Sequence, residues 1–226
     1  MKSAVLFSGG KDSTMSLYNA ISNGDDVLYL CAMISRNSES YMFHVPNINY
    51  TSIMACALDI PIITTYTDGM KEEELKDLDD LFFKLKSEGV EAIYTGALYS
   101  VYQKSRIDDL CKKHNLKSIA PYWHVDEEEY MRKIVDLGFK TIITGVFAYG
   151  LDESWLGREI THKSIDELKA INEKVSINLA FEGGEAETMV LDGPIFKKSL
   201  NIISARNIWD KDNGVYIIEK INLVDK

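Results

Sequence analysis

A short glycine-containing segment directly behind an apolar run most constrains what this chain can fold into. The segment Ser8-Gly9-Gly10-Lys11-Asp12-Ser13 follows Ala4-Val5-Leu6-Phe7. The stretch that comes next, 14–21, has the i, i+3, i+4, i+7 spacing of one helix face, and Asn23-Gly24 supplies a stop signal. This order predicts a strand, a tight glycine turn and the start of a helix.

The residue types in this turn favour a phosphate site. Glycines let the backbone approach a ligand closely, and successive N–H groups at a helix start bind anions. The common P-loop, Gly-x-x-x-x-Gly-Lys-Ser/Thr, does not fit, because the glycines here are adjacent and Asp12 follows Lys11. The hexapeptide instead resembles the PP-loop of the ATP pyrophosphatases, which cleave ATP to AMP and pyrophosphate. The alternative is a plain glycine turn with a surface lysine and a helix cap at Asp12 or Ser13.

Composition limits the class of protein. The chain has 226 residues, of which 46% are hydrophobic and 27% charged, which is typical of a soluble globular protein with one large or two small domains. Without an apolar run of 18 residues or a signal peptide, we expect a cytoplasmic protein with no membrane partner. The net charge of −10 argues against nucleic acid as a partner. Cys31, Cys56 and Cys111 lie in apolar stretches and are expected to be buried thiols.

Strand-like and helix-like segments alternate through the first half of the chain. Strands are expected near 2–7, 27–34, 61–66, 91–95 and 117–120, and helices near 12–23, 48–58, 71–88, 100–114 and 127–137. The acidic stretch 71–80 is expected to be the solvated face of its helix. Such alternation predicts an α/β fold with a doubly wound parallel sheet. We place the first domain at residues 1–125.

The second half of the chain has a different pattern of expected strands, loops and helices. A strand is expected near 140–147, a polar and aromatic loop over 150–158, and a capping box, Ser164 to Glu167, opening a helix that ends near 175. The tail from 185 is β-like, with a hairpin turn at 210–214. We therefore expect a smaller C-terminal α+β domain over residues 126–226.

Two further groups of residues are candidates for the site. Gly96 follows the fourth strand, which this topology places beside the first, and Gln103 and Arg106 lie one turn apart in the next helix. A guanidinium suits a phosphate or carboxylate; the alternative is a solvated arginine. Glu182-Gly183-Gly184-Glu185-Ala186-Glu187-Thr188 holds three carboxylates around two glycines. Paired carboxylates can bind a cation or take a proton, unless the segment is a plain acidic turn.

Together these blocks resemble the diphthine–ammonia ligase family, also called diphthamide synthetases. The PP-loop identifies only the superfamily, and the loop around Trp155 and the Glu-Gly-Gly-Glu segment are the specific part. At Ala186 the family more often has an aromatic residue. The resemblance spans nearly the whole chain through Ser8–Ser13, Ser40–His44, Gly96 with Tyr102-Gln103 and Arg106, Gly150–Arg158, and Glu182–Thr188 with Leu191–Pro194.

The resemblance implies a PP-loop ATPase fold of the adenine nucleotide α-hydrolase type and an AMP-forming ligase. Its substrate would be diphthine, a modified histidine on translation elongation factor 2. The diphthine carboxylate would attack ATP to give an acyl-adenylate and pyrophosphate, and ammonium would then displace AMP to form the amide of diphthamide. ATP and Mg²⁺ are the expected cofactors, and the oligomeric state, a homodimer included, is left open.

The resemblance also implies roles for individual residues. Catalysis is expected from Lys11, Asp12, Glu185 and Glu187, with Asp12 also the metal ligand. Trp123 and Trp155 are expected to form apolar walls that exclude water from the adenylate. The nucleotide-binding set is Ser8, Gly9, Gly10, Lys11, Asp12, Ser13, His44, Gly96, Gln103 and Arg106. The substrate-binding set is Trp123, Glu153, Trp155, Gly157, Arg158, Glu182, Gly183, Gly184 and Thr188.

Missing features narrow the choice among related chemistries. Thiolating PP-loop enzymes use cysteines, and none here has a suitable spacing. Glutamine-fed amidating enzymes carry a glutaminase domain, for which this chain has no room, so we expect free ammonium as the nitrogen source. Two alternatives stay open: an RNA-modifying PP-loop enzyme, and a non-catalytic adenine-nucleotide sensor on the same fold.

Overall fold

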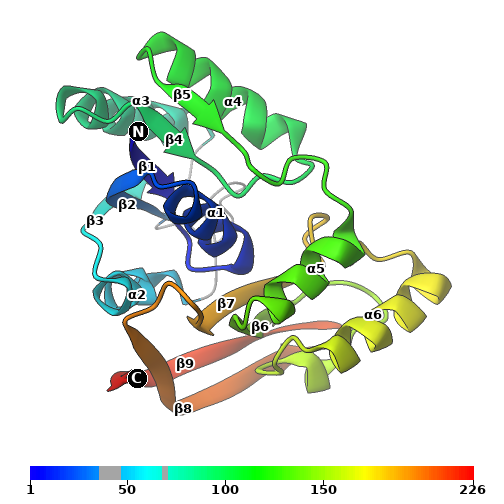
Figure 1. The fold of residues 1–226 in the computed structure, drawn as a ribbon. Helices are drawn as coiled ribbons and strands as arrows, with labels where there is room; N and C mark the ends of the chain where they lie inside the picture. The colour runs from blue at the N-terminus through cyan, green and yellow to red at the C-terminus, as the bar shows by residue number, and fades with distance from the viewer. Residues whose placement is uncertain (36–46, 68–70) are drawn as a thin grey trace. The chain divides into compact units, whose positions relative to one another are not determined.

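The computed structural model describes residues 1–35, 47–67 and 71–226 (Figure 1). The chain folds as two compact units. The first unit comprises Met1–Ser8 and Asp12–His124, and the second comprises Gly9–Lys11 and Val125–Lys226. The glycine turn therefore belongs, by its contacts, with the C-terminal half of the chain.

The first unit is built on a five-stranded sheet in the order β3-β2-β1-β4-β5. All neighbouring strands are parallel, and β1 lies between β2 and β4. This arrangement places the fourth strand beside the first, as the alternating pattern predicts. The strands are β1 (Lys2–Leu6), β2 (Asp26–Ser35), β3 (Ile62–Thr67), β4 (Ala92–Tyr94) and β5 (Lys117–Ile119).

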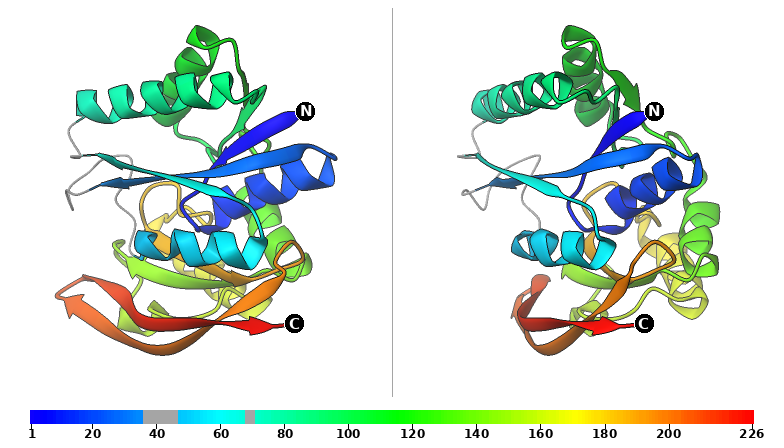
Figure 2. Two further views of the ribbon diagram at one scale, coloured as in Figure 1. Left: turned by 90° about the vertical axis from the view of Figure 1, so that its left-hand side faces the viewer. Right: turned by 60° about the vertical axis from the view of Figure 1, so that its left-hand side comes forward.

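Helices cover both faces of this sheet, so the predicted doubly wound α/β fold is confirmed. Figure 2 shows α1 and α2 on one face and α3 and α4 on the other. The helices are α1 (Lys11–Ser22), α2 (Thr51–Leu58), preceded by the 3₁₀ turn η1 (Ile48–Tyr50), α3 (Lys71–Ser87) and α4 (Val101–Lys113).

One core cluster of the first unit lies between the sheet and helices α3 and α4, and the inner sides of α1 and α2 are also buried. Members of the cluster include Ala4, Cys31, Leu78, Phe82, Ile93, Ile107 and Cys111.

Two expectations about the burial of single residues in the first unit are wrong. Glu74 is buried at 1% exposure, because it lies one turn before Leu78 on the core-facing side of α3. Cys56 is exposed, because the other side of α2 faces the core.

The second unit contains a four-stranded antiparallel sheet in the order β7-β6-β9-β8. Its strands are β6 (Lys140–Val146), β7 (Ala186–Asp192), β8 (Lys198–Asp210) and β9 (Asn213–Asp225). Its helices are α5 (Glu127–Asp136), the 3₁₀ turn η2 (Glu153–Trp155) and α6 (His162–Val175). The smaller C-terminal α+β fold is thus confirmed, and β8 and β9 form the expected hairpin.

The start of α6 differs from the expectation. Its N-cap is Thr161, whose Oγ1 accepts from the Ser164 backbone N–H at 3.2 Å, while the Thr161 N–H donates to Ser164 Oγ at 2.7 Å. The predicted box from Ser164 to Glu167 is therefore wrong. The serine hydroxyl fills the role that glutamate usually has at the third helical position, so the helix starts earlier.

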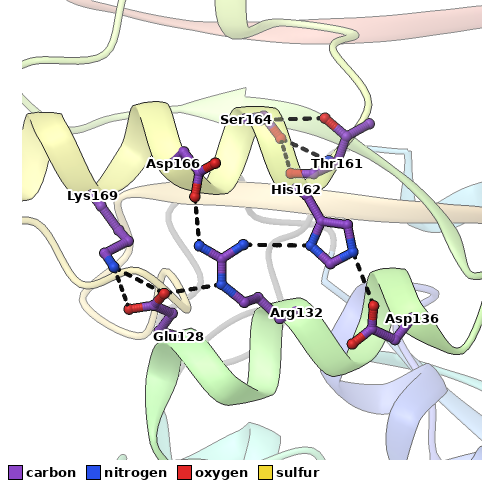
Figure 3. A network of polar contacts seen from close by, with 8 residues as sticks. All are labelled: Glu128, Arg132, Asp136, Thr161, His162, Ser164, Asp166 and Lys169. Atoms are coloured by element: carbon purple, nitrogen blue, oxygen red, sulfur yellow. Dashed lines mark hydrogen bonds and ion pairs between the residues drawn. The ribbon is translucent and has the colours of Figure 1, made fainter.

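Ion pairs join α5 to α6 (Figure 3). Arg132 of α5 donates from Nε to Glu128 at 2.9 Å and from a terminal nitrogen to Asp166 of α6 at 2.5 Å. Lys169 of α6 reaches Glu128 at 2.8 Å, and this bond, followed by that from Arg132, lowers the pKa of the Glu128 carboxyl.

None of the helices in the described ranges has the length and apolar character needed to cross a bilayer.

Candidate functional site

The glycine turn lies between the end of β1 and the start of α1, as predicted. Gly9 has a φ of +81°, which glycine adopts without strain. Ser13 closes the turn, because its Oγ lies 3.3 Å from both the backbone N and the Oγ of Ser8. One compact loop therefore joins the exit from the strand to the first turn of the helix, and the N-terminus of a helix is where proteins commonly bind anions.

Gly96 packs directly against the helix start, as expected from its place after β4. A Cβ on Gly96 would lie 2.6 Å from the carbonyl carbon of Asp12 and 2.8 Å from the backbone N of Ser13. Next to it, Ser16 Oγ donates to the carbonyl of Thr95 at 2.7 Å. No side chain fits at position 96, so the glycine sets how closely the end of β4 approaches α1.

In the second unit, the Gly9–Lys11 segment lies on strand β7. The Val190 N–H donates to the Gly9 carbonyl at 3.0 Å, and the Lys11 N–H donates to Thr188 Oγ1 at 3.1 Å. The structure therefore brings Thr188, a predicted site residue, to the glycine turn. Lys11 is 3% exposed, and its Nζ lies 5.4 Å from the centre of the Phe181 ring, a distance at which a ring stabilises a cation.

The Glu-Gly-Gly-Glu segment leads into β7, but its carboxylates have different surroundings. Glu185 precedes the strand, and its two oxygens accept from the backbone N–H groups of Asn178 at 2.9 Å and Gly183 at 2.8 Å. Glu187 lies within the strand, opposite Gly145 of β6. Glu182 donates its N–H to Asn178 Oδ1 at 3.2 Å. Glu185 thus holds the loop together.

The α4 residues cluster at the start of their own helix. Ser100 caps α4 by accepting from the Gln103 N–H at 3.3 Å. The Arg106 guanidinium carbon lies 3.3 Å from the centre of the Tyr102 ring, and a terminal nitrogen donates to the Tyr102 carbonyl at 3.3 Å. The planar stacking that suits arginine therefore orients this side chain along α4.

Trp123 lies in the first unit. Its ring stacks on His124 with centres 4.6 Å apart, and Lys104 Nζ lies 5.5 Å from its centre. His44, another predicted nucleotide ligand, lies outside the described residues, as does the whole Ser40–His44 block.

Comparison with known families tests the resemblance drawn from the sequence. The family model described as the diphthamide synthase N-terminal domain matches residues 1–118, and that of the diphthamide synthase C-terminal domain matches residues 126–224. The chain belongs to the diphthamide synthase family. The resemblance drawn from the PP-loop and the Glu-Gly-Gly-Glu segment is thereby confirmed.

Individual relatives agree with this assignment. The chain is 30% identical to a diphthine–ammonia ligase of Rattus norvegicus, with 99% of this chain aligned to 95% of that protein. It is 29% identical to the Homo sapiens ligase, covering 91% of this chain and 84% of the relative. All of it aligns, at 29% identity, with only 40% of the Schizosaccharomyces pombe ligase.

A solved structure from Methanocaldococcus jannaschii, described as a predicted subunit of tRNA methyltransferase, aligns with 88% of this chain and 99% of its own. It has 16% identity and a TM-score of 0.44. A likeness this weak carries no argument about function.

The Trp155 loop of this chain is tightly packed. Trp155 is 4% exposed, and the Arg158 guanidinium lies 4.3 Å from its ring centre while bonding Glu167 at 2.7 Å. A Cβ on Gly157 would lie 2.8 Å from the Tyr216 ring. Glu153 is exposed, with Asn207 Nδ2 at 3.4 Å from its carboxylate. Trp155 therefore packs in the interior, where it has little free surface to offer as a wall.

Sequence reasoning missed three residues of the candidate site. Phe181 contacts Lys11. Asn178 bonds Glu182 and Glu185 of the Glu-Gly-Gly-Glu segment, and Glu127 in turn accepts from Asn178. Glu127 stands in an acidic helix start, where carboxylates are expected for their effect on the helix dipole. Nothing local separates it from its neighbours, because its partner lies 51 residues away.

Proposed function

We propose that this chain is an ATP-dependent diphthine–ammonia ligase. It would join ammonium to the carboxylate of diphthine on translation elongation factor 2, through an acyl-adenylate, and release AMP and pyrophosphate. A single observation carries the proposal: the PP-loop turn bonds to β7 within a few residues of the Glu-Gly-Gly-Glu segment. Relatives that align over nearly the full lengths of both chains carry the name of this ligase.

The phosphate turn would bind the β- and γ-phosphates of ATP. The N–H groups at the start of α1 and the ammonium of Lys11 would stabilise the negative charge that develops on the departing pyrophosphate. The bonds to Thr188 and Val190 hold the turn in place before ATP arrives. The turn is therefore preorganised, so little reorganisation is needed in the transition state.

Asp12 fits the role of a magnesium ligand. It lies half-buried in the first turn of α1, and Mg²⁺ is commonly held by one or two carboxylates together with the phosphates of the substrate. Within residues 1–35, 47–67 and 71–226, no group of three His, Cys, Asp or Glu side chains forms a cage for a metal. When bound, Mg²⁺ would neutralise phosphate charge.

The carboxylates after Gly184 would bind ammonium and take its proton. Ammonium must lose a proton before it can attack an acyl group, and a carboxylate can attract the cation and accept that proton. We assign this role to Glu187, because it lies in β7 next to Thr188, which bonds the glycine turn. Residues 1–125 would bind the nucleotide and 126–226 the acceptor protein, in the cytoplasm where translation takes place.

Amide formation on a defined acceptor tests the proposal. The protein is incubated with ATP, Mg²⁺, ammonium and elongation factor 2 bearing diphthine, and the mass of the modified peptide is measured by mass spectrometry. We expect conversion of the acid to the amide with one AMP per amide. Acceptor-independent nucleotide binding without AMP would favour a sensor, and AMP formation that depends on RNA would favour the RNA-modifying alternative.

The nitrogen source provides a second arm of the same assay. We expect ammonium to support the reaction, because a base near the acyl centre suits a free amine. Amide formation with glutamine alone, in ammonia-free buffer and with no partner protein, would contradict this part of the proposal.

A further inference from the structure

We infer that Glu127 and Asn178 form a clamp that positions the Glu182–Glu187 segment for amide formation. Both are positioning residues, which act on the reaction through the segment that they hold. The inference rests on the proposed function, because it assigns that segment to the ammonium half-reaction.

Asn178 is the centre of the loop that leads to β7. Its Oδ1 accepts from the Ala180 N–H at 2.9 Å and from the Glu182 N–H at 3.2 Å, and its own N–H donates to Glu185 at 2.9 Å. Two of its polar groups thus bind three separate points of the loop. One residue therefore determines the path of the loop, including Phe181 with its φ of +63°.

Glu127 fixes Asn178 from helix α5. Its Oε1 accepts from Asn178 Nδ2 at 2.6 Å, and its Oε2 accepts from the Leu179 N–H at 2.8 Å. Both carboxylate oxygens are used, in a pattern that needs two acceptors facing two donors. Hydrogen bonds to a charged acceptor are about twice as strong as neutral ones, so the clamp orients the amide of Asn178 strongly.

The helix that carries Glu127 is itself braced. Asp126 caps α5 by accepting from the Glu129 N–H at 2.9 Å. The adjacent Glu128 accepts from Arg132 and from Lys169 of α6, in the network of Figure 3. The anchor side chain therefore projects from a helix start that is held on two sides, and rigid supports of this kind are what a precise site requires.

The clamp reaches the reacting groups through the loop. Phe181 contacts Lys11, and Glu185 accepts the Phe147 N–H on its carbonyl at 2.9 Å immediately before β7 begins. Glu187 and Thr188 follow in that strand. A shift of Asn178 would therefore move Phe181, Glu182 and the entry to β7, and misplacements near 1 Å can cost about a hundredfold in rate.

Replacing the carboxylate at position 127 by an amide, and the amide at position 178 by a carboxylate, tests the clamp. In Glu127→Gln an amide donor faces a donor, and in Asn178→Asp two carboxylates face each other. In the double variant the polarity is reversed but complete. The amide introduced at position 127 can accept from the Leu179 N–H and donate to the carboxylate introduced at position 178, whose other oxygen still accepts from Ala180 and Glu182. We expect each single variant to lower kcat of amide formation by about ten- to a hundredfold, with KM for ATP changed less than about twofold. The double variant should recover kcat to within about threefold of the wild-type chain.

Glu129→Gln is the matched control, because this exposed carboxylate lies on the same helix turn and is expected to leave kcat unchanged. Melting temperatures and the fraction of ATP-binding molecules are measured alongside, so that kcat refers to folded protein. If a single variant does not fold, the kcat of the double variant alone decides. A wild-type kcat in folded single variants, or a double variant no better than the singles, would overturn the clamp. A wild-type chain that forms no amide would instead refute the proposed function.

Discussion

Replacing Gly96 by alanine should show that the position of the glycine turn controls the rate of AMP formation independently of the stability of the fold. The added Cβ would lie 2.6 Å from the carbonyl carbon of Asp12, whereas carbon atoms in contact stay roughly 3.5 Å or more apart. The end of β4 and the start of α1 must therefore separate by about 1 Å. Because the obstructing atoms are backbone, no rotamer change can relieve the overlap.

Two magnitudes follow from this displacement. Overpacking of this kind costs about 1–3 kcal/mol of folding free energy, which lowers Tm by about 2–12 °C in a chain of this size. A 1 Å misplacement of phosphate-binding groups costs about a hundredfold in rate. We therefore expect Gly96→Ala to remain folded at 20 °C and to form AMP about a hundred times more slowly than the wild-type protein.

The assay measures AMP by chromatography, with diphthine-bearing elongation factor 2 and ammonium present, and Tm by circular dichroism. Gly89→Ala is the control: no atom lies within 4 Å of its Cβ, and its φ of +88° imposes backbone strain of about 1–2 kcal/mol. It should lose stability to a similar degree and keep its rate. A wild-type rate in Gly96→Ala, or an equal loss of rate in Gly89→Ala, would refute the reasoning.

Three further predictions concern single side chains. Lys11→Ala or Asp12→Ala should slow AMP formation at least tenfold, the scale of about 1.4 kcal/mol for one charged contact to phosphate; wild-type rates in both would remove the PP-loop interpretation. Glu187→Gln should slow amide formation on the order of a hundredfold at nearly constant ATP affinity, and full activity in acceptor assays would contradict its role. Hydrogen bonds from Lys113 and then His114 lower the pKa of Asp79, so its charge stabilises the fold above the unfolded pKa of about 3.9 and this contribution is lost as pH falls through the folded pKa. Asp79→Asn should thus have a lower Tm than wild type at pH 7 and the same Tm near pH 2, whereas an equal deficit at both would oppose this origin.

The sequence predicts the architecture of the first unit well because buried parallel strands and amphipathic helices leave a local pattern. The glycine turn at Ser8–Ser13, with a strand before it and a helix after it, follows from residue type alone. The approach of Gly96 follows from parallel topology, which puts β4 beside β1. Errors arise where one residue departs from the average of its segment. Glu74 is buried in an acidic helix, and Cys56 is exposed on an apolar one.

The second unit shows what a sequence pattern cannot supply. Glu182, Glu185 and Glu187 look equivalent along the chain, yet Glu185 turns back onto Asn178 and Gly183, while Glu187 lies in the strand. The pairing of Glu127 with Asn178 joins positions with no shared periodicity. Trp155 is of a residue type that often lines ligand pockets, but it packs in the interior. Local patterns specify helices and strands, whereas side-chain partners depend on distant backbone.

The three cysteines give this chain a built-in reporter of unfolding. Cys56 is exposed on α2, whereas burial raises the pKa of the Cys31 and Cys111 thiols to about 12. Because alkylating reagents attack the thiolate, a pulse at neutral pH should label one sulfur in folded molecules and all three after unfolding. The mass of the labelled protein therefore counts open first units directly, without a dye or a mutation. Added ATP should slow the appearance of the triply labelled species, since a ligand that binds only the folded state lowers the open fraction by mass action.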